Sequence, residues 1–104
     1  MTRGRYKSEG LDAAAVGERL RLTRHALDKK QGDFARSDGI ERNTYNQYET
    51  GVNKISTDMA HKLCDAYAEY GLTFDWIYRG DPSGLRTSLA EAIRALRQAR
   101  QSDN

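Results

Sequence analysis

The chain has 104 residues, of which 38% are hydrophobic and 31% are charged, so its length allows one small domain with a modest core. The sequence has no apolar run of the ~18 residues that a membrane helix needs, no signal peptide, and a single cysteine, which excludes an internal disulfide. These features predict a cytoplasmic protein. Residues 1–56 carry eleven Lys and Arg against eight Asp and Glu, whereas residues 57–104 carry six against seven. This surplus of positive charge in the first half favours a polyanionic partner.

The first two predicted elements are a basic arm and a long helix. Residues 1–10 combine Gly and Ser with three cations, which predicts a flexible arm that either lies in a minor groove or stays a disordered tail. The cations are Arg3, Arg5 and Lys7. A helix is expected from Asp12, because apolar side chains then recur at helical spacing with charged residues outside their stripe. The stripe consists of Val16, Leu20, Thr23 and Leu27, and the charged residues outside it are Glu18, Arg19 and Arg21.

Two short helices joined by a tight turn are expected next. The first covers residues 31–37 and buries two of its side chains. These are Phe34 and Ala35. Asp38 and Gly39 then form the turn, because glycine adopts the left-handed conformation that a tight turn needs. The following helix spans about residues 41–50 and ends at Gly51.

The second half of the chain predicts two more helical segments, a boundary and a final helix. Residues 57–70 carry apolar side chains at helical spacing after a cap at Ser56 or Thr57. The segment TFDWIY predicts one further turn, which Thr73 caps and which turns three side chains towards the core. These side chains are Phe74, Trp76 and Ile77. Pro82 marks a boundary, after which a charged helix carries one apolar stripe. That stripe consists of Leu85, Leu89, Ile93 and Leu96. Because no strand-like alternation or internal repeat is visible, the chain is predicted to be all-α.

The expected helix over residues 41–50 has an unusual polar face. Helical spacing places four amide or guanidinium side chains together, although Asn is a poor helix former. They are Arg42, Asn43, Asn46 and Gln47. Tyr45 and Tyr48 fall on the opposite, core-facing side. The two short helices and the tight turn between them form a helix-turn-helix. In this motif the second helix lies in the major groove, where Asn and Gln bond adenine and Arg bonds guanine. The four side chains are therefore predicted to read bases; the alternative is a merely solvated face.

A set of motifs within residues 17–51 makes the prediction more specific. In order, these are Gln31, Phe34-Ala35, Gly39-Ile40 and Glu49-Thr50-Gly51. Their order and spacing resemble the phage-repressor-type (Cro-like, XRE) helix-turn-helix family, and the segment LTFDWIYRG resembles the last helix of that family. The resemblance implies a five-helix phage-repressor-like DNA-binding domain over residues 11–80. Residues 81–104 would then form a linker and an additional C-terminal helix.

The resemblance also implies roles for individual residues. Gln31 would bond a phosphate, and Arg24 and Glu49 would form a partly buried ion pair between the first and third helices. The residues that would meet the DNA backbone in the following loop are Thr50, Asn53 and Lys54. Two positions depart from the family. Lys30 replaces the usual Ser or Thr cap but is itself expected to reach a phosphate, and Glu41 takes the cap position of the recognition helix.

The remaining reactive side chains do not form a recognisable catalytic or metal site. His25 and His61 lack the spaced partners that a metal site needs, and Cys64 lies in a predicted core helix, where we expect it to be buried and inert. The sequence has no nucleophile–base pair and no phosphate loop. Neither an enzymatic activity nor a metal or other cofactor is therefore expected.

The apolar stripe of the last helix has two interpretations. It either folds back over Trp76 or meets a second copy of the chain. A homodimer is favoured, because repressors read two half-sites with two copies and the core already has its helices. The dimer contacts would be Leu85, Leu89, Ile93 and Leu96.

Together these patterns predict a sequence-specific regulator of transcription, a repressor in particular, that binds double-stranded DNA. One alternative is an antitoxin that shares the DNA-binding domain and binds a toxin protein through residues 81–104. Another is a protein-interaction module that has lost DNA binding, although its interface would favour apolar and aromatic side chains over the amides seen here.

Overall fold

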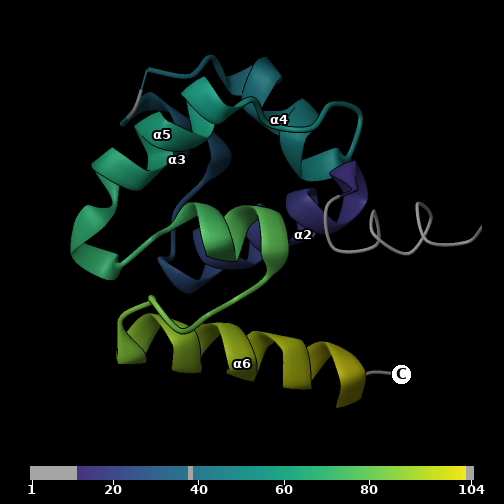
Figure 1. Ribbon diagram of the computed structural model, residues 1–104. Helices are drawn as coiled ribbons and strands as arrows, with labels where there is room; N and C mark the ends of the chain where they lie inside the picture. Colours follow the sequence, from purple (N-terminus) through teal and green to yellow (C-terminus); the bar gives the residue numbers. More distant parts are fainter. Residues whose placement is uncertain (1–11, 38, 103–104) are drawn as a thin grey trace, which may run out of the picture.

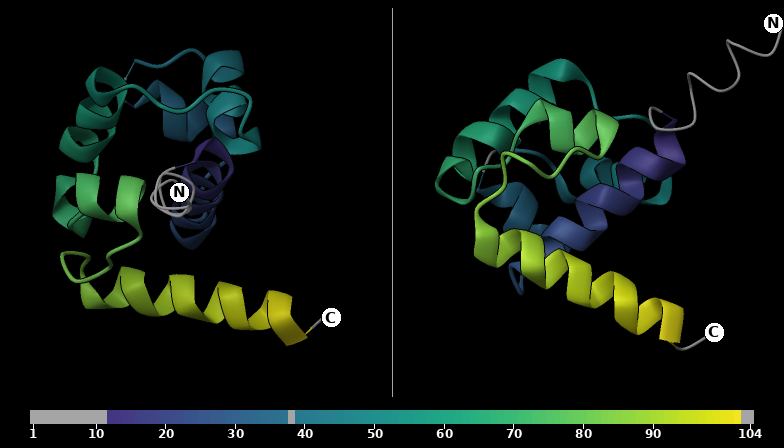
Figure 2. Two further views of the ribbon diagram at one scale, coloured as in Figure 1. Left: turned by 45° about the vertical axis from the view of Figure 1, so that its right-hand side comes forward. Right: turned by 60° about the horizontal axis from the view of Figure 1, so that its bottom comes forward.

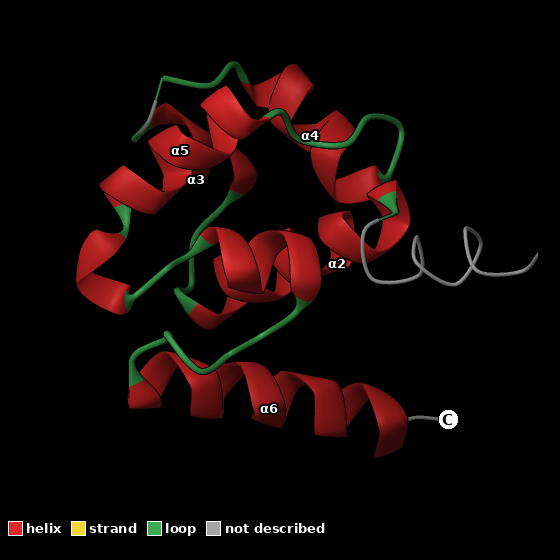
Figure 3. Cartoon of the chain, viewed as in Figure 1, coloured by secondary structure: helices red, strands yellow, loops and turns green. Residues whose placement is uncertain are grey.

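The computed structural model describes residues 12–37 and 39–102, without the side chains of the last two, and every regular element in these ranges is a helix (Figure 1, Figure 3). In chain order the elements are α2 (Ala13–Ala26), α3 (Gln31–Arg36), α4 (Arg42–Thr50), α5 (Thr57–Ala66), the 3-10 turn η1 (Ala68–Tyr70), the π-helical turn η2 (Asp75–Arg79) and α6 (Thr87–Ser102). This order confirms the predicted all-α fold with an additional C-terminal helix.

Local caps explain where several of these helices begin and end. The Asp12 side chain accepts a 2.7 Å hydrogen bond from the backbone N–H of Ala15 at the start of α2. Ser56 caps α5 through the N–H of Met59 at 3.2 Å. The segment predicted as one helix over residues 57–70 is instead α5 followed by η1, and Gly71 ends it in the left-handed conformation.

The core gathers around α2, which contacts α4, α6 and η2. Figure 2 shows α2 end-on, with α4 on one side of it and α6 on the other. Two rings from α3 and the end of α5, Phe34 and Tyr67, are stacked with centroids 4.6 Å apart. The Tyr67 hydroxyl also donates to the backbone carbonyl of Phe34 at 3.2 Å, which fixes α3 on the core. The turn after α3 contains Gly39 at φ 79°, in the left-handed region that we expected.

Two predictions about burial are wrong. Arg19, expected outside the stripe, is buried, and its Nε and Nη2 each donate a 2.9 Å bond to the carbonyls of Ile77 and Tyr78. The guanidinium therefore satisfies carbonyls at the end of η2. Burial, and then the charge of Arg97, lowers the pKa of Arg19 below its ordinary value. Phe74, expected in the core, is 44% exposed, whereas its neighbours Trp76 and Ile77 are buried as predicted.

The apolar stripe of the last helix covers the chain's own core. Leu85, Leu89 and Ile93 are buried within the domain, and Leu96 packs against the same core. The predicted dimer contact through Leu85, Leu89 and Ile93 is therefore wrong, because these side chains are already buried within one chain, whereas Leu96 is only partly buried. Two arginines of α6 add to this attachment: Arg100 pairs with Glu18 of α2, and the guanidinium of Arg97 lies over the ring of Trp76.

The last helix, α6, does not cover α3 and α4. Both Figure 1 and Figure 2 show α6 on the side of α2 away from α3 and α4. Over the part of the chain that the structure describes, no helix combines the length and apolar character needed to cross a membrane.

Candidate nucleic-acid interface

The outer face of α4 presents polar side chains to solvent. Arg42, Asn43, Asn46 and Gln47 are exposed. On the other face Tyr45 is fully buried and Tyr48 is 7% exposed, so the aromatic side chains anchor the helix. The same nine-residue helix thus has one side fixed in the core and one side free to meet a partner.

A carboxylate caps the start of α4. One oxygen of Glu41 accepts hydrogen bonds from the backbone N–H of Thr44 at 3.0 Å and from its hydroxyl at 3.3 Å. The hydrogen bond from the Thr44 backbone, followed by one from the Asn43 backbone, lowers the pKa of Glu41 below its ordinary value. The unusual residue at this position therefore makes the bond that a small polar cap would make.

The start of α3 and the start of α4 enclose a cationic cleft. This cleft has a volume of about 460 Å³ and is lined by Arg24, Lys30, Gln31, Gly32, Asp33, Arg36 and Arg42. Four of its seven residues are cations, and its one carboxylate, Asp33, is paired with Arg36 at 3.3 Å. Lys30 precedes α3 without a side-chain cap bond, so its charge stands beside the positive end of that helix. The cleft therefore has the charge and the position to receive a phosphate group.

Arg36 was missed by the sequence analysis. It is exposed at the end of α3 and lines the cleft together with Gly32, one turn earlier on the same face. The spacing of four residues could have shown this, because residues i and i+4 share a helix face. What the spacing could not show is that the same face opens towards Arg42 of the next helix.

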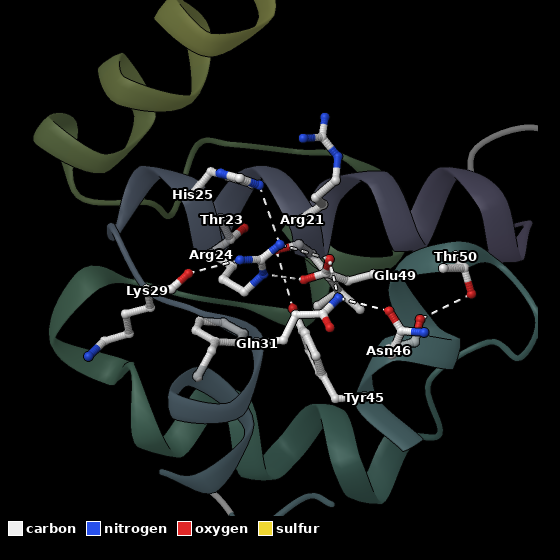
Figure 4. A network of polar contacts seen from close by, with 12 residues as sticks. Arg21, Thr23, Arg24, His25, Lys29, Gln31, Tyr45, Asn46, Glu49 and Thr50 are labelled. Carbon is white, nitrogen blue, oxygen red and sulfur yellow. Dashed lines mark hydrogen bonds and ion pairs between the residues drawn. The ribbon is translucent and has the colours of Figure 1, made fainter. Parts of the chain in front are cut away.

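An ion pair joins α2 to α4 behind the exposed face (Figure 4). Nε of Arg24 lies 2.6 Å from one oxygen of Glu49, and its Nη2 donates to the other at 3.1 Å. The side chains of Arg24 and Glu49 are only 12% and 4% exposed. Burial alone would raise the pKa of Glu49, but hydrogen bonds from Arg24, Tyr45 and Gln31 together with the Arg24 charge lower it. The structure thus brings together the two residues that the resemblance implied as a pair.

The Gln31 side chain, which the resemblance assigned to a phosphate, makes two hydrogen bonds within the protein. Its Nε2 donates to Asn46 at 2.9 Å and to Glu49 at 3.1 Å, so both hydrogens of this amide are used within the protein. The side chain retains only an acceptor oxygen, which cannot bond a phosphate oxygen. In the free protein this side chain therefore joins α3 to α4, and its contact with a phosphate stays a prediction.

The predicted backbone-contacting residues lie at the other end of α4. Asn53 donates through Nδ2 to Oε1 of Gln47 at 2.9 Å, and its backbone N–H donates to the Gln47 carbonyl. The Thr50 hydroxyl bonds back to the carbonyl of Asn46 at 3.0 Å. Lys54 is exposed in the same loop. Cationic or polar groups thus flank the exposed polar face of α4 at both of its ends.

The other reactive residues stand apart from this surface. Burial raises the pKa of the half-buried Cys64 thiol to about 11, so the thiolate that would react is scarce at neutral pH. His61 is exposed and pairs with Asp65 at 3.3 Å. No group of three metal-ligating side chains is found among residues 12–37 and 39–100. The predicted arm residues Arg3, Arg5 and Lys7 lie outside the described residues.

Comparisons with known proteins give one family and one relative. A family model described as a helix-turn-helix domain matches residues 15–71, which is more than half of the chain. The antitoxin PezA of Streptococcus pneumoniae is 33% identical over 52 residues, which are 50% of this chain and 33% of that relative. The chain thus spans about a third of the length of this relative. No solved structure matches the chain.

Proposed function

Because the chain belongs to the helix-turn-helix domain family, we propose that it is a sequence-specific duplex-DNA-binding regulator of transcription, and a repressor in particular. The observation that carries this proposal is the exposed polar face of α4 beside the cationic cleft. In the docking geometry of this motif α4 lies in the major groove and α3 crosses the phosphate backbone. Regulation then follows from occupying a site that the transcription machinery needs.

The two kinds of contact have separate tasks in this proposal. Lys30 and Arg36 of the cleft, and Lys54 beyond α4, would neutralise phosphates and supply affinity for any sequence. Asn46 and Gln47 would bond base edges and supply the preference for one sequence. The buried tyrosines of α4 support this division, because they hold the reading face in a fixed position on the core.

A pair of chains on two half-sites belongs to the same proposal. Half-sites about one helical turn apart match two recognition helices related by a twofold axis. Since the Leu85, Leu89 and Ile93 side chains are buried in one chain, such a pair would use a different surface.

The second candidate function is that of an antitoxin, and the similarity to the antitoxin PezA favours it. An antitoxin would use α4 for DNA in the same way and would bind a toxin protein through residues 81–104. Coexpression with the product of the neighbouring gene distinguishes the two functions. A stable complex that is weakened by Arg94→Glu, at an exposed position of α6, would favour the antitoxin, and two proteins that elute separately would favour the repressor alone.

The first experiment is selection of binding sites from a random duplex library at ~150 mM salt, followed by titration of the winner against scrambled DNA. We expect a motif with twofold symmetry. A single half-site would support base recognition by α4 but contradict binding as a pair of chains. Binding without any motif would overturn sequence-specific recognition. No binding at all would favour a protein-interaction module.

Matched variants separate the two kinds of contact. Asn46→Ala should relax preference at particular base pairs, whereas Lys54→Ala should weaken all sequences alike and lower the salt slope by about one. Arg94→Ala is the control for loss of one charge, because Arg94 is exposed on α6, away from α4. Identical behaviour of the Asn46 and Lys54 variants would remove the assignment of base reading.

A further inference from the structure

A relay of hydrogen bonds fixes the orientation of an exposed amide on α4. It begins at Arg24, which can only donate, and passes to the Glu49 carboxylate, which can only accept. Because Glu49 accepts, the amide that approaches it from Gln31 must present its nitrogen, and Nε2 lies 3.1 Å from the carboxylate oxygen. The chemistry of the ion pair thus determines which way the Gln31 amide is turned.

The same nitrogen carries the relay to the reading face. The second hydrogen of Gln31 Nε2 points at Asn46, 2.9 Å away, and only the amide oxygen of Asn46 can accept it. The nitrogen of that amide then lies on the side turned away from Gln31, as Figure 4 shows. A flip of the Asn46 amide would place two N–H groups against each other and lose the bond.

We propose that Gln31 is a positioning residue for base recognition, which makes Asn46 present its NH₂ group to DNA. This inference rests on the proposed function. An amide fixed in this way selects a base edge with hydrogen-bond acceptors. Guanine presents two acceptors in the major groove, N7 and O6, whereas cytosine presents only the N4 donor. Adenine N7 and thymine O4 are acceptors as well, so Asn46 would contact guanine, adenine or thymine, and cytosine at that position is rejected.

A second amide pair joins α4 to the loop after it and lacks the ion pair of the relay. Gln47 accepts from Asn53 at 2.9 Å, but in the described part of the chain no carboxylate contacts either amide. Gln47 and Asn53 can therefore exchange donor and acceptor by flipping together, without loss of the bond. The matched control is Gln98→Ala, which removes an exposed amide from α6, outside both pairs.

The test is the DNA sequence preference of Gln31→Met. Methionine keeps the length of the side chain and lacks the amide oxygen and the NH₂ group. The base pair read by Asn46 is first identified as the one whose preference disappears in Asn46→Ala. At that base pair the preference for the selected base over cytosine should fall about fivefold or more in Gln31→Met, while affinity for scrambled DNA changes less than about twofold. Gln98→Ala should leave this base pair unchanged, and Gln31→Met in the Asn46→Ala background should add nothing.

Other outcomes overturn the inference. An equal loss of affinity for selected and scrambled DNA would make Gln31 a phosphate contact, and an unchanged preference at the Asn46 base pair would show that the amide needs no positioning. NMR of the free protein tests the relay itself, since the Gln31 side-chain NH₂ should exchange slowly with water and lose part of this protection in Asn46→Ala, which leaves the Arg24–Glu49 pair intact. Protection without any selected DNA motif would mean that the proposed function has failed while the relay stands.

Discussion

The indole Nε1 of Trp76 donates a 2.8 Å hydrogen bond to the hydroxyl of Thr23, and both side chains are 1% exposed. The same hydroxyl donates to the carbonyl of Arg19 at 2.8 Å, so one oxygen satisfies two buried groups from distant parts of the chain. This bond links η2 to the C-terminal end of α2. A position that looked like part of an apolar stripe therefore carries a polar contact of the core.

Replacing Thr23 with Val should destabilise the protein although the two side chains have nearly the same shape. The indole N–H of Trp76 would lose its partner inside the core, which costs about 1–3 kcal/mol. Trp76 is the only tryptophan, so its fluorescence follows urea unfolding directly. Thr57→Val, at an exposed threonine, should change stability by less than about 0.5 kcal/mol, and an equal loss in both variants would refute the role of the bond.

Gly17→Ala should weaken the packing of α2 on α4. A Cβ at Gly17 would lie 2.4 Å from the carbonyl oxygen of Tyr48 and 2.5 Å from that of Glu49, and backbone atoms cannot rotate away. The two helices must then separate, and we expect a loss of about 1–3 kcal/mol in chemical unfolding.

Gly32→Ala provides the matched control for that prediction. A Cβ at Gly32 would meet only side-chain atoms, the nearest being Cδ of Arg42 at 3.6 Å. Because Gly32 lies within α3, alanine should stabilise the protein by roughly 0.5–1 kcal/mol through its helix propensity. Destabilisation of the same size in both variants would contradict the steric argument.

Acid should remove the contribution of the Arg24–Glu49 pair. The pKa of Glu49 is lowered in the folded chain, so the unfolded chain binds this proton more readily. The contribution is therefore complete above the ordinary carboxyl pKa of about 4.3 and is lost as the pH falls through that value to the lower folded pKa. The free energy of unfolding, measured between pH 3 and 7, should show this decrease.

Two variants isolate the pair from the other carboxylates. Glu49→Gln should be less stable than the wild type at pH 7, and the difference should shrink as the pH falls below about 4.3. Glu91→Gln, at an exposed carboxylate of α6, should keep the wild-type pH dependence. Glu49→Ala should lose about 3–5 kcal/mol, because Arg24 is left buried without its partner, and a wild-type melting temperature would remove the assignment.

Ile93→Ala should lower the folding stability of the single chain, and this loss should not depend on association between chains. Ile93 is 3% exposed within the domain, so its truncation should cost about 2–5 kcal/mol. Melting temperatures at protein concentrations differing about twentyfold are the measurement. The loss should be the same at both, whereas a loss confined to low concentration would place Ile93 in an interface between chains. Gln98→Ala, exposed on the same helix, is the control.

The sequence by itself determined the helical elements and the polar face of α4, because both depend on residues within one or two turns of each other. The caps at Asp12 and Ser56 and the left-handed end at Gly51 are local, and so is the separation of Asn46 from Tyr45 by a helical step. Such features require no knowledge of what the rest of the chain does.

Tertiary structure alone decided which partner each side chain meets. An apolar stripe indicates that α6 must be covered but not by which chain, and the answer depends on how α6 crosses α2. Arg19 is buried because the carbonyls at the end of η2 lie above it, and Phe74 is exposed because η2 turns Trp76 and Ile77 inward instead. The contact of Gln31 with Asn46 likewise joins residues fifteen apart, and it exists only because α3 and α4 pack together.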